Sequence, residues 1–400
     1  MRPRRRMKMI RLETQYFNLN RILLLAVGLW PYQQSNFTRL QFIFFSTILT
    51  TSLIFQCTPF ISQKCTPDLV VKVLSSASIF AFIVIMYNTF CVNIEAMKNL
   101  LEQLQHTYNE VKDKNELAII NAYGYNAKQC TAVFTISGIC SLSVLIVAEF
   151  WSRILDIISP MNVSQLHSLP IIMEYFIDQE KYFYWILLHF NVSLCIGITA
   201  LIGIGTTIIA YFQHMCGIIR ISSYRIKRTV QINTLKNDKL KNEILMQGII
   251  STVEIHRQAI KLSELLISTN EKMFFCLITV GVVSLSLNLF RIFQIASYGD
   301  DIMEILFPFI SVAVTILAMF IANYVTQDLT DINDDLFVTV YNIQWYKTPL
   351  HIQKLILFLL QKGTKKFTIS VGGLFIGSLE CFAMLVKASV SYFTVIYSMQ

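Results

Sequence analysis

The chain has 400 residues, of which 54% are hydrophobic and 14% charged, and it carries 29 phenylalanines. This composition is too apolar for a soluble domain, and the chain is too long for one membrane span, so the sequence predicts a polytopic, all-α membrane protein. The net charge of +8 does not indicate a nucleic-acid-binding surface, because the basic residues are spread over the segments between the apolar runs.

Residues 1–39 form a basic arm that contains one short apolar segment, Ile22–Trp30. That segment is too short to cross a bilayer, so we expect an interfacial or docked helix there. No signal peptide is expected, because a small-residue cleavage site is lacking. Seven later runs are long enough to span. They are Leu40–Cys57, Leu69–Val92, Gln129–Phe150, Tyr182–Phe212, Met273–Ala296, Ile302–Val325 and Phe367–Met399.

The basic residues predict the orientation of these spans. With the N-terminus in the cytoplasm, 27 of the 33 Lys and Arg residues fall in cytoplasmic segments and three fall outside. By the positive-inside rule we expect the N-terminus inside and the C-terminus outside, which is opposite to G-protein-coupled receptors. Trp151 and Trp185 then lie at the outer interface. The sequon at Asn162 lies in the long outer loop as a candidate glycosylation site.

The cytoplasmic segments are long enough to form structure of their own. Residues 235–272 carry Leu245, Ile249 and Val253 on one helical face, and we expect this amphipathic helix to enter the fifth span and to bury that face against neighbouring subunits. The sixth span is predicted to continue past the membrane through three aspartates, at positions 328, 331 and 335. A solvated or ion-paired face is favoured there over calcium binding, because the glycine and terminal glutamate of a calcium loop are missing.

The last apolar run is interrupted by Gly372–Gly373 and Gly377, so we expect a split helix with a cytosolic first half and a membrane half that ends at Met399. The helices from the fourth span onward are expected to extend into a cytoplasmic anchor. The resulting division is 1–39, the N-terminal arm; 40–213, spans one to four; 214–272, the amphipathic loop; 273–325, spans five and six; 326–379, the anchor; and 380–400, the second half of the seventh helix.

No catalytic or metal-binding pattern stands out. The six histidines are scattered outside any His-Glu-x-x-His motif, a phosphate loop is missing, and Gly203 and Gly205 lie within a span. The sequence therefore predicts neither an enzyme, nor a cofactor, nor a metal site. Of the nine cysteines, Cys57 and Cys65 could meet outside the membrane, and we expect them to be reduced.

The final segment, 380–400, is an apolar helix with one polar stripe. At 100° per residue the stripe occupies an arc of about 100°. Its members are Glu380, Lys387, Ser391, Thr394, Val395 and Ser398. Such a stripe on an apolar helix is typical of a pore wall. The alternative is an ordinary membrane helix whose hydroxyls bond their own carbonyls and whose Lys387 reaches to the interface.

Three motifs near the C-terminus resemble the insect odorant receptor family. They are Tyr341-Asn342-x-x-Trp345-Tyr346-x-x-Pro349, Gly372-Gly373-x-Phe375 and Lys387-x-Ser389-x-Ser391-Tyr392-Phe393-Thr394-Val395. The chain's length, seven spans and predicted orientation are also similar to that family. The resemblance implies a ligand-gated, non-selective cation channel in the plasma membrane of sensory neuron dendrites, assembled as a tetramer with the odorant co-receptor. By position, it implies that Val395 is the hydrophobic gate, with Ser398 and Met399 just outside it.

The alternatives to a tuning subunit are the co-receptor, a gustatory receptor and a transporter. The co-receptor carries Gln where Ser398 stands and has a longer loop than 214–272, so the chain resembles a tuning subunit. A gustatory receptor would usually end in Thr-Tyr, five apolar residues and Gln-Phe, whereas Ser391-Tyr392 here leads to Ser398-Met399. A transporter would require paired repeats with broken helices, which the two halves do not show.

Aromatic and aliphatic residues in the outer halves of the spans suggest a ligand pocket. The expected lining is Phe80, Val144, Val147, Trp151, Phe190, Leu194 and Phe309. Such a cavity would hold a small, mostly apolar volatile molecule by shape and dispersion, with few hydrogen bonds and therefore broad tuning. The alternative is that these side chains are ordinary packing or lipid-facing residues.

Overall fold

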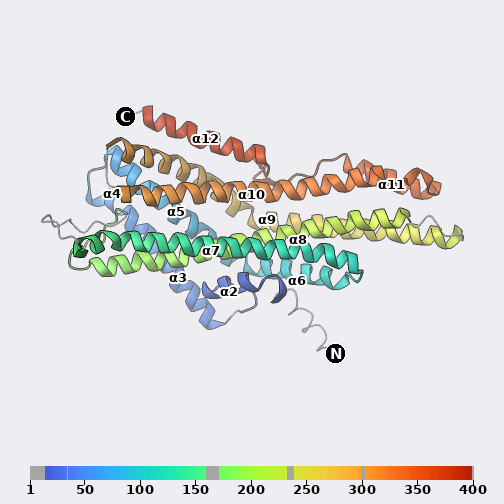
Figure 1. Ribbon diagram of the computed structural model, residues 1–400, viewed down its shortest axis with the longest axis horizontal. Helices are drawn as coiled ribbons and strands as arrows, with labels where there is room; N and C mark the ends of the chain where they lie inside the picture. The colour runs from blue at the N-terminus through green and yellow to red at the C-terminus, as the bar shows by residue number, and fades with distance from the viewer. Residues whose placement is uncertain (1–13, 34, 159–170, 232–237, 299–301, 399–400) are drawn as a thin grey trace.

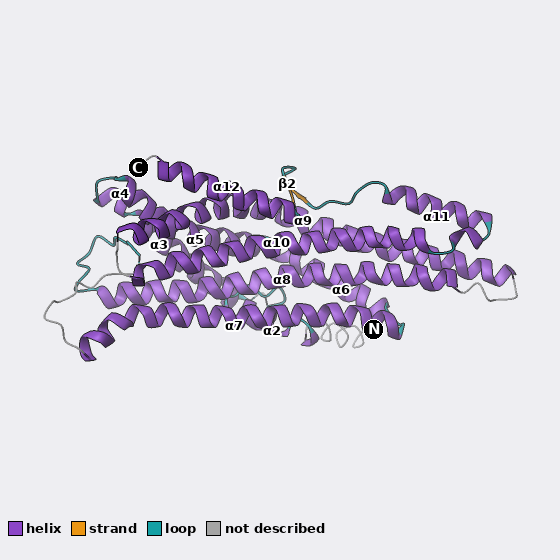
Figure 2. Cartoon of the chain, turned by 45° about the horizontal axis from the view of Figure 1, so that its top comes forward, coloured by secondary structure: helices purple, strands orange, loops and turns teal. Residues whose placement is uncertain are grey.

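The computed structural model describes residues 14–33, 35–158, 171–231, 238–298 and 302–398. The chain forms an elongated helical bundle whose long helices run side by side (Figures 1 and 2). The elements are α2 (Asn18–Ala26), α3 (Asn36–Cys57), α4 (Pro59–Ser62), α5 (Pro67–Val92), α6 (Ile94–Glu110), α7 (Lys114–Ile158), α8 (Phe183–Gln231), α9 (Asp238–Tyr298), α10 (Ile302–Asn342), η1 (Trp345–Lys347), α11 (Leu350–Gly363), β1 (Ser370–Val371), β2 (Phe375–Ile376) and α12 (Leu379–Ser398).

Within the described ranges, seven helices are long and apolar enough to cross a membrane, which confirms the predicted number of spans. They are Asn36–Ser62, Pro67–Val92, Lys114–Ala148, Phe183–Gln231, Asn242–Ser297, Ile305–Asn342 and Leu379–Ser398. The end of the bundle that carries α11 is called the inner end and the end that carries α4 the outer end, after the sides that the basic residues predict (Figure 1).

Several helices are much longer than a membrane requires. Helix α9 has 61 residues, so at 1.5 Å per residue it is about 90 Å long, against about 30 Å for the hydrocarbon core. Helix α7 also begins at Lys114, well before the predicted start of the third span at Gln129. The inner extension therefore includes the third spanning helix, whereas the sequence suggested only the helices from the fourth span onward.

Helix α2 is docked against the bundle. Phe17 and Leu24 are buried, and so is the polar side chain of Asn20. The Asn20 Nδ2 donates to Thr206 Oγ1 of α8 at 2.8 Å, and its Oδ1 accepts from Thr131 Oγ1 of α7 at 3.3 Å. Because these bonds join three elements in an apolar interior, the helix that begins the short apolar segment of the arm is docked on the bundle.

Ion pairs hold the inner extensions together. Glu116 of α7 is buried and accepts two bonds of 2.8 Å from the Arg225 guanidinium of α8, which also donates to Ser251 of α9 at 2.7 Å. Arg220 of α8 pairs with Asp335 of α10 at 3.0 Å. The predicted ion pairing of the α10 aspartates is therefore confirmed at Asp335.

The apolar face of residues 235–272 packs mainly within the same chain. Leu245 and Ile249 are buried in the main hydrophobic core, and a Cβ at Gly248 would clash with the Thr229 side chain of α8. Val253 is 39% exposed. The expectation that this face is buried against neighbouring subunits was wrong for Leu245 and Ile249, because α8 extends far enough to cover them.

The segment before α12 is a hairpin. Strands β1 and β2 pair antiparallel, with Val371 opposite Phe375. Gly372 and Gly373 form the turn with φ of +62° and +65°, a conformation that side-chain-bearing residues rarely adopt. The expected cytosolic half-helix between Phe367 and residue 379 was therefore wrong, although the chain does break at these glycines. The Gly372 N–H donates to Glu271 Oε1 of α9 at 3.0 Å, which ties the turn to the bundle.

Candidate functional site

A buried apolar cluster lies between α5 and α8 in the outer half of the bundle. Phe80 of α5 and Phe190 of α8 are 0% and 2% exposed, and their ring centroids are 6.0 Å apart. Leu194 lies one turn further along α8 in the same cluster. Ile171 and Met173, from the segment that precedes α8, complete it. The structure thus brings together three of the residues that the sequence suggested for a pocket.

Three other suggested residues point away from this cluster. Val144, Val147 and Phe309 are 49%, 55% and 60% exposed. Their neighbours Leu142 and Phe307 pack on the cluster instead. The sides of α7 and α10 that face the cluster are therefore not the ones that the sequence suggested. Trp151, Asn162 and Met399 lie outside the residues whose side chains the structure describes.

A series of hydrogen bonds borders the cluster, and the sequence analysis did not suggest it. The Tyr175 hydroxyl lies 2.7 Å from His189 Nδ1, and His189 Nε2 lies 3.1 Å from Thr51 Oγ1 of α3. Burial raises the pKa of Tyr175 to about 12, so the phenol stays neutral and can donate to the imidazole. The position of His189 inside an apolar run could have indicated these hydrogen bonds from the sequence.

The segment 171–182 is fixed over the outer end of the cluster. The Tyr175 ring stacks on Phe55 of α3 with centroids 4.1 Å apart. The backbone of Glu174 donates to the Phe55 carbonyl at 3.0 Å and accepts from Thr58 Oγ1 at 2.5 Å. These contacts close the cluster from the outer side, so a molecule that enters it is shielded from water.

Helix α12 has one packed face and one open face. Cys381 and Leu385 are buried against α9 and α10, and Ser389 is buried beside them. The open face carries the whole of the described polar stripe. Its exposed members are Glu380, Lys387, Ser391, Thr394, Val395 and Ser398. Thr394 and Ser398 also donate to carbonyls of their own helix, at 2.7 and 2.9 Å, as the alternative interpretation of the stripe expects.

Helix α9 connects the cluster-bearing helix to α12. Asn288 Nδ2 donates to the Ser75 carbonyl of α5 at 3.1 Å, and Ser286 Oγ donates to the Ser389 carbonyl of α12 at 2.9 Å. Nearer the outer end, the ring of Phe293 meets that of Tyr397 with centroids 4.9 Å apart. Direct contacts through α9 therefore join α5 to α12.

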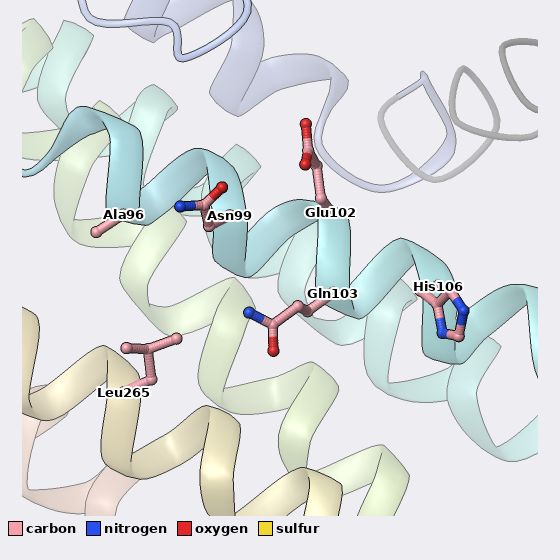
Figure 3. Close-up of a pocket in the computed structure, with 6 residues that line it drawn as sticks. All are labelled: Ala96, Asn99, Glu102, Gln103, His106 and Leu265. Atoms are coloured by element: carbon pink, nitrogen blue, oxygen red, sulfur yellow. The ribbon is translucent and has the colours of Figure 1, made fainter.

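A hollow of about 420 Å³ lies elsewhere, between α6 and α9 at the inner end (Figure 3). It is lined by Ala96, Asn99, Glu102, Gln103, His106 and Leu265. Four of the six lining residues have polar or charged side chains, and in Figure 3 Glu102 points away from α9. The hollow is open to solvent and would not enclose a small apolar ligand, so we assign the candidate ligand site to the buried cluster.

Comparison with known proteins identifies the family and supports the fold. The chain matches the family model "7tm Odorant receptor" over residues 66–390. The fold is similar to the structure of the insect olfactory receptor OR5 from Machilis hrabei in complex with eugenol, with a TM-score of 0.80, 14% identity and coverage of 98% of this chain and 100% of that one. Another structure of the same receptor gives a TM-score of 0.76 at 13% identity, with the same coverage.

A search of curated proteins gave no match. The family model spans most of the chain, and both olfactory receptor structures share its seven-helix architecture along nearly the whole length. This chain belongs to the seven-transmembrane odorant receptor family.

Proposed function

We propose that this odorant receptor is the ligand-binding subunit of a ligand-gated, non-selective cation channel, assembled with the odorant co-receptor in the plasma membrane of sensory neuron dendrites. The observation that carries the proposal is the position of α9. This helix contacts α5, which holds Phe80 of the buried cluster, and also α12, which presents an open polar stripe. A ligand site and a pore wall are thereby linked through one rigid element.

Ligand binding is assigned to the buried cluster. Phe80, Phe190 and Leu194 offer apolar surface for dispersion contacts, and Tyr175 closes the site from the outer side. The similar OR5 receptor was solved in complex with eugenol, a small aromatic molecule. By analogy we expect a small volatile organic ligand here.

Channel opening is assigned to α12. In a tetramer, four open faces such as this one would surround an axis, with Val395 as an apolar ring within an otherwise polar wall. An apolar constriction closes a pore by dewetting, and a small widening rehydrates it. Displacement of α9 by a ligand under α5 would supply that widening through Ser286 and the rings around Phe393.

The proposal is tested by whole-cell recording from cells that express this chain with the co-receptor. The probes are hydrocarbons, alcohols and esters of similar size. We expect at least one probe to evoke a cation current only when both chains are present. A probe-driven uptake of solute without channel current would favour a transporter, and current from tastants alone would favour a gustatory receptor.

A further inference from the structure

Three fully buried polar side chains lie beside the ligand cluster. Ser52 and Gln56 of α3 and Ser193 of α8 are each 0% exposed. The Ser52 and Ser193 hydroxyls and both amide atoms of Gln56 lack a hydrogen-bond partner among the described residues. Buried polar groups are nearly always paired, so this set calls for a partner that comes from outside the chain.

Two of these side chains, Ser52 and Gln56, lie together beside the cluster. They are four residues apart, so they share one face of α3, and Leu53 between them packs on the cluster. Ser193 lies at another level. Because α3 and α8 run in opposite directions, the hydrogen bond between Thr51 and His189 puts Gln56 more than one turn toward the outer end and Ser193 about one turn toward the inner end.

The chemistry of these groups defines what fits. The Gln56 amide offers two donor protons and an acceptor oxygen, and each serine hydroxyl can both donate and accept. A ligand hydroxyl can accept a bond from one of the neighbouring pair Ser52 and Gln56 and donate to the other. A ketone or ester oxygen can only accept, and an alkane leaves every group unpaired. An unpaired buried group is costly, which penalises the alkane most.

We propose that Ser52 and Gln56 form the polar end of the ligand site, and that the ligand class is a small, mainly apolar alcohol. The inference rests on the proposed function and narrows it. It also changes the expected tuning. Discrimination between homologous alcohols stays shallow, because it depends on apolar packing, whereas discrimination against the matching alkane becomes steep.

The test compares matched sets of six- to ten-carbon primary alcohols, methyl ketones and alkanes on the chain co-expressed with the co-receptor. Half-maximal concentrations are measured for the unmodified chain, for Gln56→Met, which keeps the side-chain volume, and for Ser52→Ala. Ser143→Ala is the matched control, because Ser143 is exposed and its hydroxyl bonds to the Ile139 carbonyl of its own helix.

For the unmodified chain we expect each alcohol to act at about 10- to 100-fold lower concentration than its alkane, with the ketone between them. Gln56→Met and Ser52→Ala should each narrow this ratio by about 5- to 10-fold, because the alcohol loses a hydrogen-bond partner and the alkane no longer leaves that group unpaired, whereas Ser143→Ala should preserve the ratio. Equal responses of the unmodified chain to alcohol and alkane would overturn the inference. So would a uniform shift for all probes in Gln56→Met, which indicates a packing role.

Thermal stabilisation of the purified full chain in detergent by the same probes gives a second readout. Stabilisation by the alcohol that is lost in Gln56→Met supports the polar end even if no current is recorded, and in that case only the proposed channel function fails. Stabilisation that is equal for alcohol and alkane, or that persists in Gln56→Met, counts against the polar end whatever the channel does.

Discussion

The buried ion pair between Glu116 and Arg225 should contribute far more to stability than the exposed pair beside it. Glu116→Gln removes the carboxylate charge that accepts two hydrogen bonds of 2.8 Å from the Arg225 guanidinium. The Glu116 side chain is 8% exposed and the Arg225 side chain 22% exposed. Breaking a buried pair typically costs about 3–5 kcal/mol. Because Arg225 keeps some contact with water and its bond to Ser251, we take about 3 kcal/mol.

The assay is thermal unfolding of the purified chain in detergent. Unfolding entropy is about 2.1 cal/mol/K per residue, so over 400 residues a loss of about 3 kcal/mol lowers the midpoint by about 4 °C. Asp113→Asn is the matched control. Asp113 also pairs with an arginine of α8, Arg228, but both side chains of this pair are more exposed than those of Glu116 and Arg225. Asp113→Asn should leave the midpoint unchanged.

Asp113 is a valid control at neutral pH because it stays ionised there. A hydrogen bond from the Asn115 backbone and the pairing with Arg228 lower its pKa, so any contribution to stability is present at neutral pH and is lost only as the pH falls through this lowered pKa. Adding Arg225→Met to Glu116→Gln should recover at least half of the lost stability. Equal midpoints for Glu116→Gln and Asp113→Asn would refute the reasoning.

Three further predictions concern the ligand site and the gate linkage. Phe190→Ala should raise the half-maximal concentration of the best probe by about 10-fold or more at equal surface expression, because it removes a buried ring from the cluster, whereas Val144→Ala, at an exposed position, should not. Tyr175→Phe keeps the stack on Phe55 but removes the bond to His189, so we expect faster ligand washout with a change in half-maximal concentration of about 2- to 10-fold, and unchanged washout would argue against a closing role for Tyr175. Ser286→Ala removes the bond from α9 to α12 and should change the maximal ligand-evoked current, whereas Ser297→Ala on the same helix, whose hydroxyl bonds only the Phe293 carbonyl in the described structure, should not; identical maxima for both variants would remove this bond from the linkage.

The number of spanning helices could be predicted from the sequence, but the faces that they bury could not. Val144 and Val147 are as apolar as Leu142, yet they are exposed, while Leu142 packs on the cluster. In a bilayer, lipid tails are as apolar as a protein core, so hydrophobicity does not tell an inward face from a lipid-facing one. Small residues carry more information here. A Cβ at Gly197 would lie 2.9 Å from Ile83, which marks the close approach of α8 to α5.

Long-range contacts explain the other differences. The helical pattern of residues 235–272 is correct, but the covering of Leu245 and Ile249 by α8 depends on how far α8 extends, which no local pattern reveals. The Tyr175–His189–Thr51 chain joins residues up to 138 positions apart. The glycine pair at 372 and 373 did mark the break before α12, because positive φ is a local property.

The measurement that tests the assignment of the pore most directly is the ion selectivity and ligand-free current of channels that contain Val395→Ser. If α12 of this chain lines the cation pore, a polar residue at the apolar ring should raise the ligand-free current and alter block or relative permeability. Val390→Ser, at a position that is also exposed but lies outside the polar stripe, should leave them as they are. Unchanged ligand-free current and permeability in Val395→Ser, at normal surface expression and with normal ligand-evoked current, would contradict the assignment of this helix to the pore.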